Sequence, residues 1–205
     1  MAITTKSAKV IFQLRVSLRD TKPPIWRSVQ VPDATKLPRL HEILQLLFNW
    51  EGYHLHEFVA RGLVYGIPDP NDQHEVNDER RVPLSRMVDR VGDSFDYVYD
   101  FGDDWRHDIL LDAILLPTPR IFYPQCIAGA RNGPPEDAGG SPGYAYYLKV
   151  IGDPAHKDHE AMLAWHGPFD PDAFSVAAIN ASLNRSMPSR RKKSGNASGG
   201  LGLRN

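Results

Sequence analysis

The chain has 205 residues, of which 41% are hydrophobic, 24% charged and 10% aromatic. This is the composition of a globular protein, and it excludes a wholly disordered chain or a fibre. The single cysteine, Cys126, excludes an internal disulfide and favours a reducing, cytoplasmic location. No apolar run reaches the roughly 18 residues that a membrane helix requires, so no membrane association is expected.

The formal net charge of −1 hides an asymmetry along the chain. Residues 186–205 carry five basic side chains and no acid, so the rest of the chain has a net charge of −6. An acidic body argues against a broad nucleic-acid-binding face, because phosphate binding requires clustered Lys and Arg. We predict a disordered basic tail at 186–205, and nucleic acid would bind only there, through Arg190, Arg191, Lys192 and Lys193.

The first 90 residues predict strands, a helix and then strands again. Residues 9–19 alternate between apolar and polar side chains, as a half-buried strand does. Leu and Ile at helical spacing follow from residue 37. The predicted elements are strands at 9–19, 25–31, 53–60 and 63–66, a helix at about 36–49, a surface loop at 67–81 and a short helix at 83–90.

A hairpin is the strongest local prediction in the middle of the chain. Residues 94–101 and 105–114 alternate in polarity on either side of Gly102-Asp103-Asp104. The apolar phase of this alternation predicts that Phe101 and Trp105 are core residues.

The remaining third predicts one long loop and then helices. Residues 117–143 are dense in Pro and Gly, and their aromatic residues favour an ordered loop. Helices are predicted at 143–151 and after Asp153-Pro154. A last helix would start at Asp170-Pro171, with Asp170 as its N-cap.

This order of elements predicts an α+β fold, with helices packed against a mainly antiparallel sheet. We expect one domain at 9–185, preceded by an N-terminal extension at 1–8 and followed by the tail.

Candidate functional residues gather in three motifs. His54 and His56 form a His-x-His pair that a strand would hold about 7 Å apart on one face. Such a pair can share a metal ion, although hydrogen bonding within a half-buried sheet is the commoner arrangement. Asp100 and Asp103 belong to a crowded group of aspartates, which repel one another unless a cation, Arg or water screens them. A solvated acidic turn is the alternative there.

The second motif also contains His107, and the third contains the acids after the diproline. His107 lies on the apolar phase of its strand, where a buried imidazole needs a polar partner. Pro134-Pro135 would fix the direction of Glu136 and Asp137. We predict that these groups converge on one polar site, made by His54, His56, Asp100, Asp103, His107, Glu136 and Asp137.

Two interpretations of that site stay open. A divalent metal could be held by His54, His56 and His107, with zinc, manganese or iron as suitable ions. A His–carboxylate hydrogen-bond network with a structural role is favoured slightly, because no single spacing is a strong metal signature. The identity of any cofactor stays unknown at this point.

Taken in order, several motifs resemble one known family over roughly residues 9–184. They resemble the Ri-plasmid open-reading-frame-three-like family, also described as the TnpR-like passenger protein of an insertion element. The resemblance implies a compact α+β domain of bacteria and archaea that occurs near plasmid or transposon genes, and it supplies no catalytic residue. The motifs are Pro23-Pro24-Ile25-Trp26-Arg27, Leu40 to Gln45, His54-Leu55-His56-Glu57-Phe58, Tyr99 to His107, Cys126 to Gly129, Pro134-Pro135-Glu136-Asp137 with Gly139-Gly140, and Phe169-Asp170-Pro171.

The functional expectation is therefore an uncharacterised accessory domain of mobile genetic elements that binds an unidentified protein or ligand. The alternative from another class is a metal-dependent hydrolase or nuclease that uses the His, Asp and Glu cluster.

Overall fold

The protein is described by a computed structural model that covers residues 10–69 and 75–186. The expected N-terminal extension at 1–8 and the tail beyond Ser186, with Arg190, Arg191, Lys192 and Lys193, lie outside these ranges. The elements are β1 (Ile11–Leu18), β2 (Trp26–Pro32), α1 (Leu37–Phe48), β3 (His56–Ala60), β4 (Leu63–Gly66), β5 (Asn77–Asp78), 3₁₀ turns at Glu79–Arg81 and Leu84–Arg86, β6 (Ser94–Tyr99), β7 (Trp105–Leu115), β8 (Gln125–Ala130), α2 (Gly140–Ile151), α3 (His159–His166) and α4 (Val176–Ser186).

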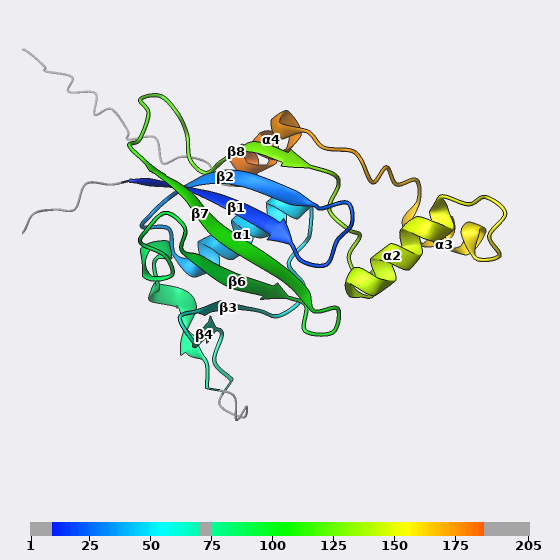
Figure 1. The fold of residues 1–205 in the computed structure, drawn as a ribbon, viewed down its shortest axis with the longest axis horizontal. Helices are drawn as coiled ribbons and strands as arrows, with labels where there is room; N and C mark the ends of the chain where they lie inside the picture. The colour runs from blue at the N-terminus through cyan, green and yellow to red at the C-terminus, as the bar shows by residue number, and fades with distance from the viewer. Residues whose placement is uncertain (1–9, 70–74, 187–205) are drawn as a thin grey trace, which may run out of the picture.

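All eight strands belong to one sheet, in the order β5-β4-β3-β6-β7-β1-β2-β8 (Figure 1). Every pairing is antiparallel except that of the two-residue strand β5 with β4. Strand β1, near the start of the chain, therefore lies in the interior of the sheet beside β7, which ends at residue 115. The α+β class with a mainly antiparallel sheet is confirmed.

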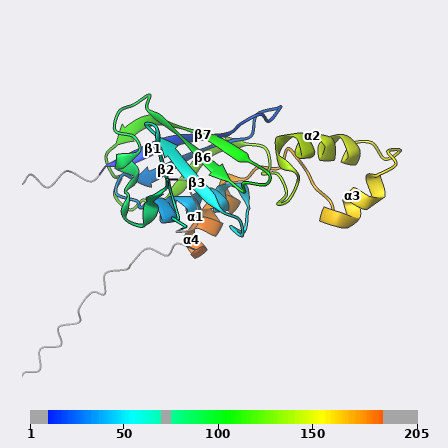
Figure 2. The same cartoon turned by 90° about the horizontal axis from the view of Figure 1, so that it is seen from below.

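Helix α1 covers one face of the sheet and supplies much of the core. Its apolar side chains recur at helical spacing and are buried, from Leu37 to Phe48. The helix ends at Asn49, which adopts the left-handed conformation with φ 62°. Helix α4 lies on the same side of the sheet, whereas α2 and α3 extend beyond its end (Figure 2). Within the described ranges, no helix is long and apolar enough to cross a membrane.

The expected loop at 117–143 contains a strand that the sequence pattern does not reveal. Strand β8 pairs with β2 at the edge of the sheet. Asn180 of α4 holds it there, because its side chain accepts from the Cys126 N–H and donates to the Cys126 carbonyl, both at 2.8 Å. The small residues of β8, such as Ala128 and Gly129, do not show the alternation of apolar and polar side chains that marks a strand.

The predicted start of the last helix at Asp170-Pro171 is wrong. Asp170 instead accepts a hydrogen bond from the Asp172 N–H at 2.9 Å, which makes a local turn. Helix α4 begins at Val176, and the Ser175 hydroxyl accepts from the Ala178 N–H at 3.2 Å, as an N-cap residue does.

The hairpin confirms one of its two predicted core residues. Trp105 is 1% exposed, but Phe101 is 53% exposed. The strand phase does not reach Phe101, because β6 ends at Tyr99 and Asp100 turns the chain with φ 58°.

These two aromatic residues provide a matched test of the core. Trp105→Ala should lower the free energy of unfolding by about 3–5 kcal/mol, because a large buried side chain is removed. Phe101→Ala, in the same hairpin, should lower it by less than about 1 kcal/mol, since the side chain is already exposed. Urea denaturation measures both values, and similar losses for the two variants would contradict this core.

Candidate functional site

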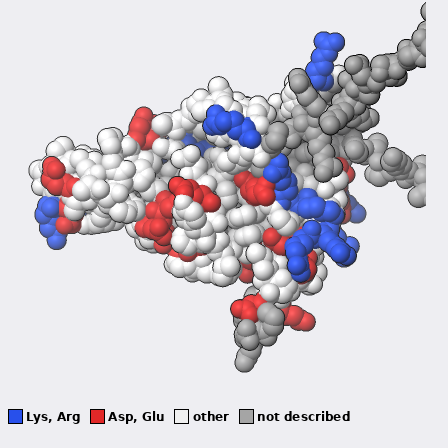
Figure 3. Space-filling view, turned by 180° about the vertical axis from the view of Figure 1, so that it is seen from behind, with Lys and Arg blue, Asp and Glu red and all other residues white. Residues whose placement is uncertain are grey.

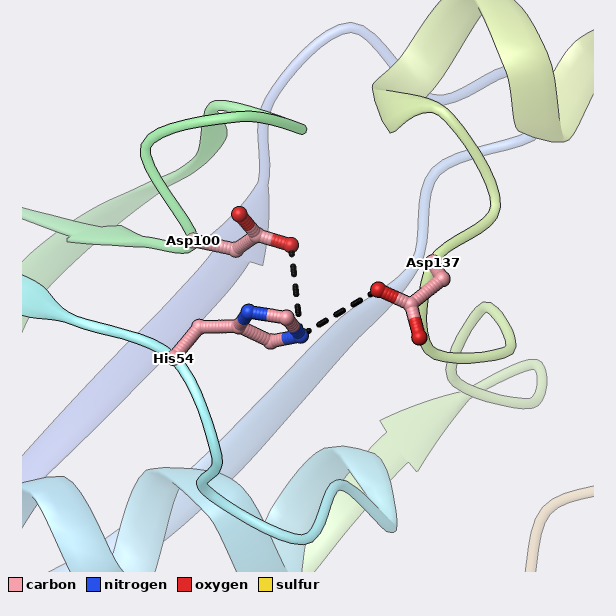
Figure 4. Close-up of side chains that lie close together, drawn as sticks. All are labelled: His54, Asp100 and Asp137. Carbon is pink, nitrogen blue, oxygen red and sulfur yellow. Dashed lines mark ion pairs between the residues drawn. The ribbon is translucent and has the colours of Figure 1, made fainter.

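Asp100, at the tip of the β6–β7 hairpin, uses one carboxylate oxygen within its own turn and directs the other out of it. Asp100 is mostly buried, and its Oδ1 accepts hydrogen bonds from the backbone N–H groups of Gly102 at 2.9 Å and Asp103 at 3.3 Å. These bonds fix the carboxylate within the turn. The other oxygen, Oδ2, points away from the turn toward His54 (Figure 4).

The diproline loop folds back onto this hairpin and onto the end of α1. The indole N–H of Trp50 donates to the Pro134 carbonyl at 2.9 Å. Asp103 Oδ2 accepts from the Gly139 N–H at 2.9 Å, which ties the far end of the loop to the hairpin. The loop is therefore held at both ends, and its two acids lie between those anchors.

Glu136 is held by two donors from different elements. Its Oε1 accepts from the Glu51 N–H at 2.7 Å, and the Tyr99 hydroxyl donates to the carboxylate at 3.2 Å from each oxygen. Burial and the neighbouring Glu136 carboxylate raise the pKa of Tyr99, so its hydroxyl stays protonated and remains a donor.

His54 lies at the centre of these carboxylates. Its Nε2 is 3.2 Å from Asp137 Oδ1 and 3.6 Å from Asp100 Oδ2 (Figure 4). It is also 3.9 Å from Glu136 Oε2. The Nε2 atom is buried, yet it has no well-directed hydrogen bond within the described part of the chain. One imidazole nitrogen is thus surrounded by three acids that come from two other segments.

The spacing of these atoms is close to that of a metal site. Zinc binds nitrogen and oxygen ligands at about 2.0–2.2 Å, so neighbouring ligand atoms lie about 3.0–3.5 Å apart. The ligand atoms of His54, Asp100 and Asp137 all lie within 4.8 Å of one another. Asp137 is the most accessible of the three, with 69% of its side chain exposed.

His56 does not share this site, in contrast to the predicted convergence. His54 precedes β3 and His56 begins it, so no continuous strand holds the two on one face. His56 Nε2 lies 3.2 Å from both oxygens of Glu79, and both residues are buried. Its ring also stacks on His41, with 3.7 Å between the ring centroids.

His41 and Glu79 are site neighbours that sequence reasoning missed. Gln45 Nε2 donates to the Tyr97 hydroxyl oxygen at 2.9 Å, and that hydroxyl lies 2.7 Å from His41 Nδ1. Burial and the nearby His56 lower the pKa of His41 to about 3. No local spacing relates His56 to Glu79, 23 residues away, so no sequence signal could have found the pair.

His107 is a core residue and lies apart from both clusters. It is fully buried, and its Nδ1 lies 3.3 Å and 3.1 Å from the carbonyl oxygens of Tyr97 and Trp105. Because both partners are acceptors, Nδ1 carries the proton, and Nε2 has no partner among the described residues. The rings of Phe48 and Trp50 pack against the imidazole.

The structure thus separates the three histidines expected to hold a metal. It brings together His54, Asp100, Glu136 and Asp137, with Asp103 at the edge of the cluster as the anchor for Gly139. His56 and His107 find partners of their own, because β3 and β7 direct them into the core rather than toward the loop.

A cavity of about 360 Å³ opens beside Glu136. The diproline loop forms one wall and the end of α3 forms another. Its polar lining includes Glu51, Asn132 and His166, and Trp165 and Phe169 supply aromatic surface.

Comparison with known proteins identifies the class to which this fold and site belong. Residues 10–178 match the model of the family described as plasmid pRiA4b ORF-3-like protein, and the chain belongs to this family. It is 38% identical over 178 residues to the uncharacterized protein y4hQ of Sinorhizobium fredii, a match that covers 86% of this chain and 90% of that one.

A solved structure shows the same fold. The crystal structure of MM3350, a protein of unknown function from Methanosarcina mazei Go1, is similar with a TM-score of 0.76 and 33% identity. The match covers 83% of this chain and 98% of that one. Neither relative carries an assigned activity in its description, so the function rests on the site itself.

The close contact between Gly140 and the hairpin generates one prediction. A Cβ on Gly140 would lie 2.2 Å from the Asp103 carbonyl oxygen, and the residue has φ +66°. Gly140→Ala should therefore push the loop off the hairpin. The left-handed conformation alone costs an alanine about 1–2 kcal/mol, and the loss of stability should exceed this amount.

Gly139→Ala is the matched control for this variant. Gly139 also has positive φ, but its Cβ would meet only Gly143 Cα at 3.5 Å. The Gly139→Ala variant should lose only the stability that corresponds to an alanine in the left-handed conformation. Equal losses for the two variants in urea denaturation would show that the contact with Asp103 has no energetic role.

The buried imidazoles generate a pH prediction. Burial lowers the pKa of His107 to about 4 and that of His41 to about 3, from an ordinary 6.5. Both are neutral in the folded protein, whereas the unfolded chain takes up their protons below pH 6.5. The free energy of unfolding should therefore be highest above about pH 6.5 and fall as the pH decreases toward about 4.

Urea denaturation between pH 7.5 and 5 isolates this effect, because carboxylates titrate mostly below that window. His41→Gln removes one of the two titrating groups and should flatten the pH dependence. A free energy of unfolding that stays constant or rises as the pH decreases from 7 to 5 would contradict the neutral buried state.

Proposed function

We propose that this protein is a binding domain whose site holds a divalent metal ion between His54, Asp100 and Asp137. One observation carries the proposal. The His54 Nε2 atom is buried, lacks a well-directed hydrogen bond and has three carboxylate oxygens within 3.9 Å. A divalent cation there would give Nε2 a partner and neutralise the carboxylates of Asp100 and Asp137.

The chemistry of the donors narrows the choice of ion. One imidazole nitrogen together with carboxylate oxygens suits zinc, manganese or iron better than calcium, which prefers oxygen ligands alone. Asp100 and Glu136 are oriented by their hydrogen bonds to the turn, to Tyr99 and to Glu51. Such support from outside the ligand set holds the donors in place before the ion arrives.

The ion would also join separate parts of the chain. His54 comes from the segment before β3, Asp100 from the hairpin tip and Asp137 from the loop before α2. Binding would therefore stabilise the loop against the sheet, which gives the protein a ligand-dependent surface for a partner.

A metal-dependent hydrolase is the second candidate, and the cavity beside Glu136 favours it. A metal with an open position would lower the pKa of a bound water, and the cavity meets the cluster at Glu136, where a substrate could bind. Nucleic acid is the less suitable substrate. On the face drawn in Figure 3, acidic and basic side chains gather in separate places, which is not the continuous basic surface that a nuclease presents.

The metal site is tested by titrating protein freed of metal by a chelator with Zn²⁺ or Mn²⁺ in a calorimeter. We expect one ion per chain. The ion should stabilise the fold by about 2.7 kcal/mol when its free concentration is 100 times the Kd. His54→Ala and Asp137→Asn should abolish binding, because the first removes a ligand and the second removes a negative charge.

Asp104→Asn is the matched control, since Asp104 is an exposed acid of the same hairpin that pairs with Arg106. It should bind the ion as the wild type does. Absence of saturable binding, or binding that survives Asp137→Asn, would leave His54 as a simple ion-pair partner and overturn the proposal. Hydrolysis of a phosphate-ester reporter that needs the ion and is lost in Asp137→Asn would favour the enzyme.

A further inference from the structure

Arg27 on β2 is a buried cation outside the His54 cluster. It is 2% exposed. Its Nε donates to the Leu47 carbonyl, and its Nη1 donates to the carbonyls of Trp26 and Ala130, each at 2.8 Å. Its guanidinium carbon lies 5.0 Å from the centroid of the Phe48 ring and 4.9 Å from that of Phe174.

No acid neutralises this charge within the described ranges. Arg27 forms no ion pair there, and the two N–H groups of Nη2 donate no hydrogen bond to a described residue. Burial lowers the pKa of Arg27 to about 10, which reflects the cost of keeping the cation out of water. A buried charge of this kind is usually paired. An anionic ligand would supply the partner that Arg27 lacks among the described residues.

Arg27 lines a groove of about 470 Å³ between the end of α1 and α4. This volume is within the range of small-molecule sites, about 300–1,000 Å³. The walls are mostly apolar, with a few polar groups. Besides Arg27, the lining includes Phe48, Phe174, Ala178 and Ile179.

We propose that this groove binds a small molecule that carries one carboxylate on an apolar body. The carboxylate would accept from Nη2 of Arg27, end-on, because Nε and Nη1 are already bonded to backbone carbonyls. The apolar body would lie along Phe174 and Ile179, where burial of its surface contributes to binding. This site is separate from the metal site, so either can fail without the other.

Three probes test the site by calorimetry: decanoate, 4-phenylbutanoate and indole-3-acetate. At least one should bind with one molecule per chain. The alcohol with the same carbon skeleton should bind about tenfold or more weakly, because a hydrogen bond to a charged group contributes about 1.5–3 kcal/mol. If none of the three binds, or if the alcohols bind as well as the acids, the proposal is wrong.

Two helix variants keep the test independent of Arg27, whose loss alone could unfold the protein. Ala178→Trp places a large side chain in the groove from an exposed position and should abolish binding. Ala177→Trp, at the neighbouring exposed position outside the groove, should leave it unchanged. Arg27→Gln, where it folds, should remove the preference for acid over alcohol. Unchanged binding in Ala178→Trp would overturn the site.

Discussion

The hydrogen bond from the Trp50 indole to the Pro134 carbonyl supports the whole arrangement around the candidate metal site. It joins residues 84 positions apart and lies in the core, where an unpaired indole N–H would be costly. Trp50 stacks on Tyr99 at 5.1 Å and packs against Trp105 at 5.8 Å between centroids. The sheet therefore holds the indole, the indole holds the diproline loop, and the loop places Asp137 beside His54.

Residues 47–51, at the end of helix α1 and just beyond it, serve both proposed sites. The Leu47 carbonyl at the end of the helix accepts from Arg27, and Phe48 covers the guanidinium. Beyond it, the Glu51 N–H orients Glu136. The loop passes so close that a Cβ on Gly133 would lie 2.0 Å from the Phe48 carbonyl oxygen. This one turn thus separates the groove proposed to bind a carboxylate from the cluster proposed to bind a metal ion.

The histidines show why residue type alone does not define a site. His54 faces carboxylates near the surface, while His107 is enclosed by Phe48 and Trp50 with only backbone carbonyls in reach. His56 meets Glu79. The same imidazole is a candidate ligand in one place and a neutral core group in another, because the surrounding dielectric and partners differ.

Local patterns in the sequence were sufficient for the α+β class, helix α1, the β6–β7 hairpin and the burial of Trp105, because periodicity depends only on neighbouring residues. They also predicted one polar site of seven residues, of which the structure brings together His54, Asp100, Glu136 and Asp137. Tertiary structure alone decided the pairing of β8 with β2, the exclusion of His56 and His107 from the cluster, and the isolation of Arg27. These features depend on contacts between distant segments, and a pattern of neighbouring residues carries no information about such contacts.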